Sequence, residues 1–347
     1  MTSSPTTGSS RAPLDLRSDT VTVPDAAMRS AMAAAEVGDD VLDRDPTMAA
    51  LEERVAGLLG CEDAIWTPSG SMANLVALMM HLDRGDMFLA PEMAHVLGSE
   101  LGTAAWLAGG MPHPLPHDGG PGRPSPGAVR RATSTEGPYY TLRTTLLCLE
   151  NTHNFAGGAV TPPEDHVQLV SAARDVGLAV HLDGARLWNA AVALGVPPAV
   201  LTVGVDTVSV CLSKGLGAPV GSVLASTRDR ITEARRIRKM LGGGVRQGGV
   251  LAAAGMVALD RLDDLGRDHE NARLLADGLR ELGWIVDDPQ TNIVLADAPD
   301  PVLAVRHLAD SGVRALPVAG RVRFITHRDV DAAGIRAALD RLSAARL

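Results

Sequence analysis

Lys214 is the residue in this sequence best suited to covalent chemistry. The 347 residues include thirty-two lysines and arginines together, and only Lys214 and Lys239 are lysines. Lys214 lies in SVCLSKGLGAPVGS (209–222), directly after an apolar run that predicts a buried strand. Lysine, unlike arginine, can release its proton, attack a carbonyl carbon and form an imine. Its retention at a strand end of an arginine-rich chain favours imine chemistry over the alternative, a surface charge.

A carboxylate and an arginine follow a second strand-like run. In HLDGARLWNAA (181–191), Asp183 closes an apolar segment and Arg186 comes three residues later. A carboxylate at the carboxyl end of a parallel strand points into the crevice where open α/β sheets bind ligands. A surface pair of Asp183 with Arg186 is the alternative. The apolar residues before Asp183 favour the crevice.

A glycine-containing turn joins a third strand-like run to a helix. In TPSGSMAN (67–74), Gly70 and Ser71 stand at the predicted helix start, where free backbone amides and the helix dipole attract phosphate. A serine-capped turn without any ligand is the alternative. The glycine-spaced loop ending in Gly-Lys that binds nucleoside triphosphates is absent from the sequence.

Together, these parts are what pyridoxal 5'-phosphate requires. Its phosphate sits on a helix start, a carboxylate keeps its pyridine nitrogen protonated, and a lysine binds its aldehyde. The order of phosphate turn, Asp183 and Lys214, with Lys214 thirty-one positions after Asp183, resembles the aspartate-aminotransferase-like class of these enzymes.

Short apolar runs alternate with helical stretches in the part of the chain that must position these residues. The strand-like runs are 64–67, 86–90, 144–151, 178–183, 206–213 and 221–226, and helical patterns cover 69–82 and 162–177. This pattern predicts an α/β fold with a mostly parallel sheet flanked by helices. We expect a disordered tail at 1–13, an arm and large domain at 14–255, and a small α+β domain at 256–347.

Composition narrows the class of protein. The formal charge of −9 argues against nucleic acid or an anionic membrane as a partner, and no apolar run is long enough to span a bilayer. Three scattered cysteines predict neither a disulfide framework nor a metal site. The polar N-terminus lacks the apolar core of a secretory signal, so a cytoplasmic location is expected.

Longer motifs carry a family resemblance. They are LRSDTVT (16–22), VGDDV (37–41), DPT (45–47), SGSMAN (69–74), LENTHN (149–154), HLDGARLWNAA, CLSKGLGAPVGS, RKMLGGGVRQGGVLAAAG (238–255) and RFITHRDV (323–330). Taken together, residues 14–341 resemble the low-specificity L-threonine aldolases of the β-eliminating lyase group. The resemblance implies the pyridoxal-phosphate fold type I and a carbon–carbon lyase.

The resemblance also implies roles for individual residues. Lys214 would bind the cofactor as a Schiff base, Asp183 would face the pyridine nitrogen, and Gly70 with Ser71 would bind phosphate. His95, in PEMAHVLGSE, would stack on the cofactor ring and assist proton transfer; a capping or surface histidine is the alternative.

Three residues would hold the substrate carboxylate: Ser18, Arg186 and Arg323, with Arg186 also near the cofactor. Arginine suits this role because its planar fork matches a carboxylate, although Arg323 could also be a strand-edge charge. Arg246 and Lys239 would reach the cofactor phosphate or the site entrance from a neighbouring subunit, in a dimer of dimers. A solvated helix charge is the alternative for Lys239.

Three positions depart from the family pattern. Leu42 and Ser99 stand where many relatives have aromatic residues, and Tyr140 stands where a second histidine is common. Tyr140 would then be the candidate partner of the substrate hydroxyl, although a phenol is a poor base at neutral pH. The loss of two aromatics predicts a wider pocket that accepts bulkier substrates such as phenylserine.

The expected reaction is the cleavage of L-threonine, L-allo-threonine and other L-β-hydroxy-α-amino acids to glycine and an aldehyde. A β-elimination or an aldol-type reaction on a bulkier β-substituted amino acid is the alternative within the class. A non-catalytic relative is disfavoured by Lys214 with Asp183, and a dehydrogenase by the lack of G-x-G-x-x-G after the first strand.

Overall fold

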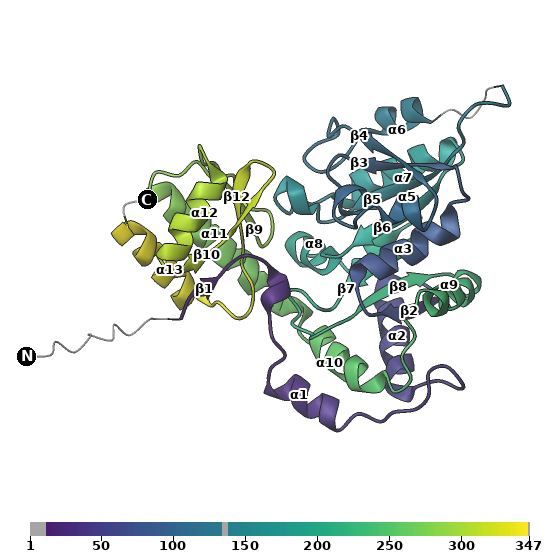
Figure 1. Ribbon diagram of the computed structural model, residues 1–347, viewed down its shortest axis with the longest axis horizontal. Coiled ribbons are helices and arrows are strands. Elements are labelled where there is room, and N and C mark those ends of the chain that lie inside the picture. The colour runs from purple at the N-terminus through teal and green to yellow at the C-terminus, as the bar shows by residue number, and fades with distance from the viewer. Residues whose placement is uncertain (1–11, 134–137, 346–347) are drawn as a thin grey trace, which may run out of the picture.

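A seven-stranded sheet is the frame of the first unit in this computed structural model, which describes residues 12–133 and 138–345 (Figure 1). In sheet order its strands are β2 (Asp63–Thr67), β8 (Ser222–Ser226), β7 (Thr207–Cys211), β6 (Ala179–Gly184), β5 (Thr144–Glu150), β3 (Met87–Pro91) and β4 (Met111–Leu115). All run parallel except β8, which is antiparallel to both neighbours. The predicted mostly parallel α/β sheet is therefore confirmed.

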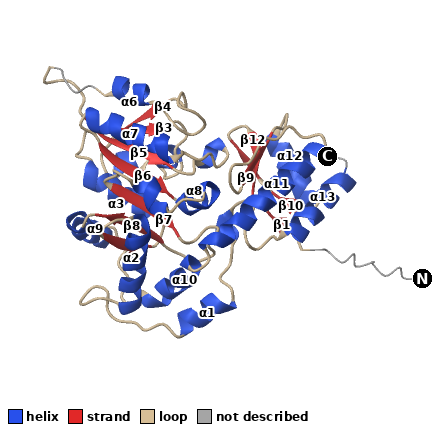
Figure 2. Cartoon of the chain, turned by 180° about the vertical axis from the view of Figure 1, so that it is seen from behind, coloured by secondary structure: helices blue, strands red, loops and turns tan. Residues whose placement is uncertain are grey.

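Helices cover both faces of this sheet, as Figure 2 shows from behind. They are α1 (Ala26–Ala33), α2 (Pro46–Leu59), α3 (Gly70–His81), α4 (His95–Gly98), α5 (Thr103–Trp106), α6 (Pro126–Ala132), α7 (Pro163–Asp175), α8 (Leu187–Leu194), α9 (Arg228–Met240) and α10 (Gly249–Leu259). Strand residues alternate between the two layers: in β5, Leu147 and Leu149 pack with α7 residues, whereas Leu146 and Cys148 pack with α3 residues. Burial on both faces explains why the strands read as continuous apolar runs.

The second unit is an antiparallel sheet with its own helices. Its elements are β11 (Leu316–Val318), β12 (Arg321–Ile325), β9 (Ile293–Ala296), α11 (Leu265–Glu281), α12 (Pro301–Asp310) and α13 (Ala332–Ala345). The N-terminal arm joins it, because β1 (Leu14–Asp15) pairs in parallel with β10 (Val313–Arg314). Leu16 is fully buried in the same core as Phe324 and Leu275.

The division between the units lies later in the chain than the sequence indicates. The predicted boundary at 255/256 falls inside α10, which packs on α1 and α2 and contributes Ala252, Ala254 and Ala258 to the core of the first unit. Nearly all of the predicted tail, 1–11, lies outside the described residues. In the described part of the chain, no helix combines the length and apolar character needed to cross a membrane.

The parallel strands bring the predicted chemistry to one edge. Glu150 and Asp183 are register partners at the carboxyl ends of β5 and β6. Lys214 follows β7 by three residues, and α3 begins three residues after β2. The arm reaches the same edge, where Thr22 Oγ1 donates to the backbone oxygen of Lys214 at 2.9 Å.

Candidate active site

Two adjoining cavities, of about 140 and 280 Å³, open at this carboxyl edge. Their walls share Thr20, His95, Asp183, Ala185 and Lys214. The larger chamber also contains Gly70 and Ser71, and the smaller contains Ser18, Arg186 and Arg323. The structure thus brings together eight of the eleven predicted site residues.

The start of α3 forms the anion-binding end of the larger chamber. Ser69 caps the helix, because its Oγ accepts a hydrogen bond from Met72 N at 3.2 Å. This leaves the amides of Gly70 and Ser71 at the positive end of the helix dipole. A Cβ on Gly70 would approach Cys211 Sγ to 3.0 Å, so the close packing of α3 on β7 requires glycine here.

Asp183 is held by neighbours on two elements. Its Oδ1 accepts from Ala185 N at 3.0 Å and its Oδ2 from Asn74 Nδ2 at 2.8 Å. Asn74 comes from α3, and its Oδ1 accepts from Ser209 Oγ at 2.7 Å and lies 3.1 Å from His181 Nε2. Because Asn74 must donate to a carboxylate, this set of partners fixes its amide orientation. Asn74 was not predicted, although it closes the motif SGSMAN.

His95 stands at the first position of α4. Its backbone N donates to Glu150 Oε2 at 2.7 Å, and its Nδ1 lies 2.8 Å from Glu100 Oε1. The hydrogen bond with Glu100 raises the pKa of His95, against the opposing effect of burial. Neither glutamate was predicted as a site residue, although Glu150 lies in the motif LENTHN and Glu100 closes PEMAHVLGSE.

Arg186 forms a buried ion pair with Asp19 of the N-terminal arm. Its Nε and Nη2 donate to Asp19 at 2.8 and 2.7 Å, and its Nη1 donates to Asn154 Oδ1 at 3.1 Å. Burial by itself would raise the pKa of Asp19, but the charge of Arg186 holds it well below the usual value. The fork of Arg186 therefore has partners in this chain, although Arg186 also lines the smaller chamber, and its contact with a substrate carboxylate stays a prediction.

Arg323, by contrast, is a buried cation without a carboxylate partner among the residues that the structure describes. It is 7% exposed, and no carboxylate of the described residues lies within ion-pair distance. Its Nη1 donates to Asn154 Oδ1 at 2.9 Å, and its Nε has no partner in the described part of the chain. Burial lowers its pKa to about 10, so the guanidinium stays charged at neutral pH. A charge left in this condition requires an anion from outside the chain.

Three predicted residues lie outside both cavities. Arg246 is exposed beside Asp39, 3.7 Å away, and Lys239 is exposed in the last turn of α9. Tyr140 is 76% exposed and precedes β5 at its amino end. The seven residues of β5 separate it from the carboxyl edge by about 20 Å. Tyr140 therefore cannot contact a substrate in the chambers of its own chain. The loop that carries it leads into the amino end of β5, whereas the chambers lie at the carboxyl end.

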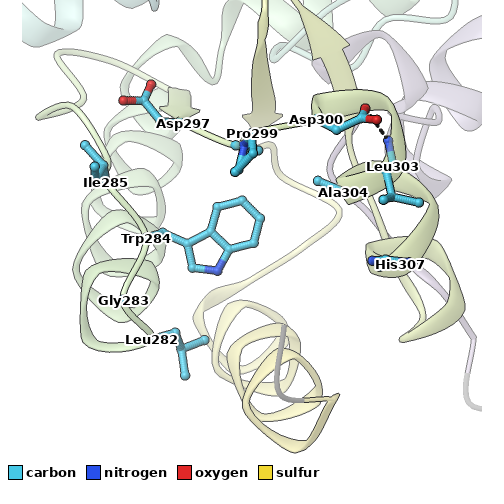
Figure 3. A pocket seen from close by; sticks show the side chains of 11 residues that line it. Leu282, Gly283, Trp284, Ile285, Asp297, Pro299, Asp300, Leu303, Ala304 and His307 are labelled. Atoms are coloured by element: carbon cyan, nitrogen blue, oxygen red, sulfur yellow. Dashed lines mark hydrogen bonds between the residues drawn. The ribbon is translucent and has the colours of Figure 1, made fainter.

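A larger cavity, of about 830 Å³, lies entirely within the second unit (Figure 3). Trp284 projects into it, between the end of α11 and α12. Its two acids have structural partners: Asp300 caps α12 through Leu303 N, and Asp297 pairs with Arg321. This cavity shares no residue with the chambers around Lys214, so its size does not make it the site of the chemistry.

Comparison with protein families identifies the chain. The family described as β-eliminating lyase matches residues 15–300. The chain belongs to the β-eliminating lyase family.

Relatives of this β-eliminating lyase extend over nearly its whole length. It is 44% identical over 329 residues to the probable low-specificity L-threonine aldolase 2 of Arabidopsis thaliana, covering 91% of this chain and 92% of the relative. It is 42% identical over 325 residues to the low specificity L-threonine aldolase of Escherichia coli (strain K12), covering 91% and 94%. A solved threonine aldolase structure from Leishmania major shares its fold, with a TM-score of 0.80 at 18% identity over 95% of this chain and 100% of that one.

Pyridoxal 5'-phosphate is the cofactor of this β-eliminating lyase, and the residues present fit it. Gly70 and Ser71 begin α3 and line the larger chamber, so their backbone amides can meet a phosphate there. Asp183 is oriented from behind by Asn74, and Lys214 lines both chambers. Lys214 would hold the aldehyde, Asp183 would face the pyridine nitrogen, and Gly70 with Ser71 would hold the phosphate.

Proposed function

We propose that this β-eliminating lyase cleaves the Cα–Cβ bond of L-threonine, L-allo-threonine and other L-β-hydroxy-α-amino acids, yielding glycine and an aldehyde. The observation that carries the proposal is Arg323, a buried and uncompensated cation in the same chamber as Lys214 and Asp183. An α-carboxylate supplies the missing negative charge. The likeness to low-specificity threonine aldolases over 91% of the chain agrees with this substrate class.

The residues of the chain divide the work. When bound, pyridoxal 5'-phosphate supplies an aldehyde for the amines of Lys214 and substrate, and an electron sink for the bond that breaks. Arg323 binds the substrate carboxylate, with Ser18 beside it, and so sets which bond at Cα faces the ring. Asp183 keeps the pyridine nitrogen protonated. His95 takes the proton of the β-hydroxyl.

We also infer that the active oligomer is a dimer of dimers in which each site takes residues from two chains. Arg246 and Lys239 support this, because both are exposed and neither lines the cavities of its own chain. Exposed Leu42 and Trp106 are further candidates for subunit contacts. A cytoplasmic location stays a prediction from the sequence.

Purified enzyme assayed with a panel of β-hydroxy amino acids tests the function. Threonine should give glycine and acetaldehyde in equal amounts, and 2-oxobutyrate as the main product would instead indicate elimination. Phenylserine should be cleaved at least as efficiently as threonine if Leu42 and Ser99, which line neither chamber of their own chain, replace aromatic side chains at the site of a neighbouring subunit. Lys214→Arg should fold but cleave nothing, since an arginine cannot form the imine.

A further inference from the structure

Glu100 is a buried carboxylate that lies behind His95. Its side chain is 1% exposed and it lines neither chamber. Its Oε1 accepts from Asn74 Nδ2 at 2.8 Å and lies 2.8 Å from His95 Nδ1. Its Oε2 has no hydrogen-bond partner in the described part of the chain.

The same chain contains a buried glutamate of plainly structural character. Glu52, in α2, accepts from Trp66 N at 2.8 Å with Oε1 and from Arg235 and Arg44 at 2.6 and 3.1 Å with Oε2. Among the described residues, Glu100 has no arginine or lysine partner and one of its oxygens lacks a hydrogen bond, an arrangement that costs stability. This cost points to a role for the carboxylate other than holding the fold together.

The hydrogen bonds fix where the protons lie around His95. Asn74 Nδ2 donates a hydrogen bond to Glu100 and another to Asp183. An amide is not acidic, so Asn74 protonates neither carboxylate. The acceptor atoms of His95, Glu100 and Asp183 all lie within 4.8 Å of one another. A proton on Nδ1 that is donated to Oε1 would reduce the repulsion between these two neighbouring carboxylates. With Nδ1 engaged, Nε2 is the ring nitrogen of His95 that is left without a partner in the described part of the chain, and the residue lines both chambers.

We propose that Glu100 is a positioning residue that holds Nδ1–H of His95, so that Nε2 faces the substrate as the base for its β-hydroxyl. This rests on the proposed function. As the O–H bond breaks, its proton passes to Nε2, the β-carbon and its oxygen become the carbonyl of the aldehyde, and the Cα–Cβ electron pair stays with Cα. The imidazolium, stabilised by the carboxylate of Glu100, then returns the proton to Cα, so that glycine and the aldehyde account for every atom of the substrate.

The charges that face His95 agree with this role. Burial raises the pKa of Glu100, and the Glu100 hydrogen bond raises that of His95, with Asp183 acting in the same direction and Lys214 opposing it. The two side chains face each other across a 2.8 Å contact, in which the hydrogen bond raises the pKa of His95 and opposes the effect of burial on the pKa of Glu100. Replacement of the Glu100 carboxylate weakens the hydrogen bond that contributes most to the raised pKa of His95 and removes the smaller contribution of the Glu100 charge.

Glu100→Gln tests the proposal because it removes the charge and keeps the shape. In the holoenzyme, the pKa of His95 is read from exchange of its C2 hydrogen, followed by mass spectrometry of its peptide, and needs no substrate. We expect this pKa to fall and the acid limb of the kcat–pH profile to move to lower pH. We expect kcat to fall roughly 10- to 100-fold with KM and cofactor absorbance nearly unchanged. His95→Asn should be as slow alone as with Glu100→Gln, because one residue acts through the other.

Glu52→Gln is the matched control: it should lower the melting temperature and leave the His95 pKa and the pH profile in place. An active wild type whose kcat, acid limb and His95 pKa are all unchanged by Glu100→Gln would overturn the inference. Additive losses in the double variant would overturn it as well. A wild type that cleaves no β-hydroxy amino acid would instead overturn the proposed function, whatever the exchange measurement gives.

Discussion

Arg323 and Arg186 both donate to Asn154 Oδ1, yet their electrostatic surroundings differ. Arg186 has the buried carboxylate of Asp19 as its partner, whereas Arg323 has none among the described carboxylates. We therefore expect the two arginines to differ in function: Arg186 stabilises the fold around the site, and Arg323 binds the substrate.

Substitution should separate the two tasks. Arg323→Ala should lower kcat/KM for threonine roughly 100- to 1000-fold, because a buried charge pair with substrate is worth several kcal/mol. Its melting temperature should change little. Arg186→Ala leaves Asp19 buried and unpaired and should destabilise the fold by about 3–5 kcal/mol. Steady-state kinetics and thermal unfolding of both variants check this; a stable, active Arg186→Ala would contradict it.

Asp268 gives the stability of the protein a pH dependence. It lines a cavity of about 520 Å³ with Gly215 and Leu216, next to the loop that carries Lys214. Burial raises its pKa from 3.8 to about 7. Between these values the folded state holds a proton that the unfolded chain has released, so the free energy of unfolding falls as pH rises from about 4 to 7.

Asp268→Asn should remove this penalty. The roughly three units between the two pKa values set an upper bound of about 4 kcal/mol on the gain above pH 7. Thermal unfolding at pH 5 and pH 8 should show a larger gain for the variant at pH 8. Equal gains at both values would mean that the carboxyl is ionised throughout.

At the scale of elements, α3 links the two ends of the cofactor site. Its first residues form the anion seat, and one turn later Asn74 holds both Asp183 and Glu100. A shift of this helix would therefore disturb phosphate, ring and base together.

Gly70→Ala should produce such a shift, because the new Cβ would lie 3.0 Å from Cys211 Sγ. Overpacking of about 1–3 kcal/mol predicts a dissociation constant for pyridoxal phosphate raised roughly tenfold or more. The double variant Gly70→Ala/Cys211→Ala removes the sulfur and should recover most of the affinity. Cofactor titration followed by visible absorbance measures both, and a double variant no better than the single one would rule out this contact as the cause.

Sequence patterns could place Lys214, Asp183 and Gly70, because each ends or begins a strongly apolar element and such elements meet at one edge. They could not reveal Asp19, Glu100 or Asn154, whose roles depend on contacts between segments far apart in the chain. Tyr140 lies outside the chambers of its own chain for a related reason: alignment with a strand gives a residue a place along the chain, whereas the direction of the strand decides which edge it reaches. Its role at a site of another chain stays a prediction.

At the scale of the whole molecule, the sharing of sites between chains is the principal prediction. Mixed oligomers of Lys214→Ala and Arg246→Ala test it. If sites are shared, a hybrid pairs an intact Lys214 from one chain with an intact Arg246 from the other and regains activity that neither variant has alone. If each chain builds its own site, every site in the hybrid lacks one residue and the mixture stays inactive. Analytical ultracentrifugation of the same samples gives the oligomeric state.

The arm has a consequence for how the protein is made. β1 pairs with β10, and Asp19 and Thr22 next to it hold Arg186 and the Lys214 loop. The arm around β1 therefore cannot form its native contacts until residues 313–314 have been synthesised. During translation the large sheet can fold early, but the catalytic cleft is completed only when nearly the whole chain has left the ribosome. Nascent chains truncated before β10 should thus carry the lysine, the aspartate and the phosphate turn without forming a working enzyme.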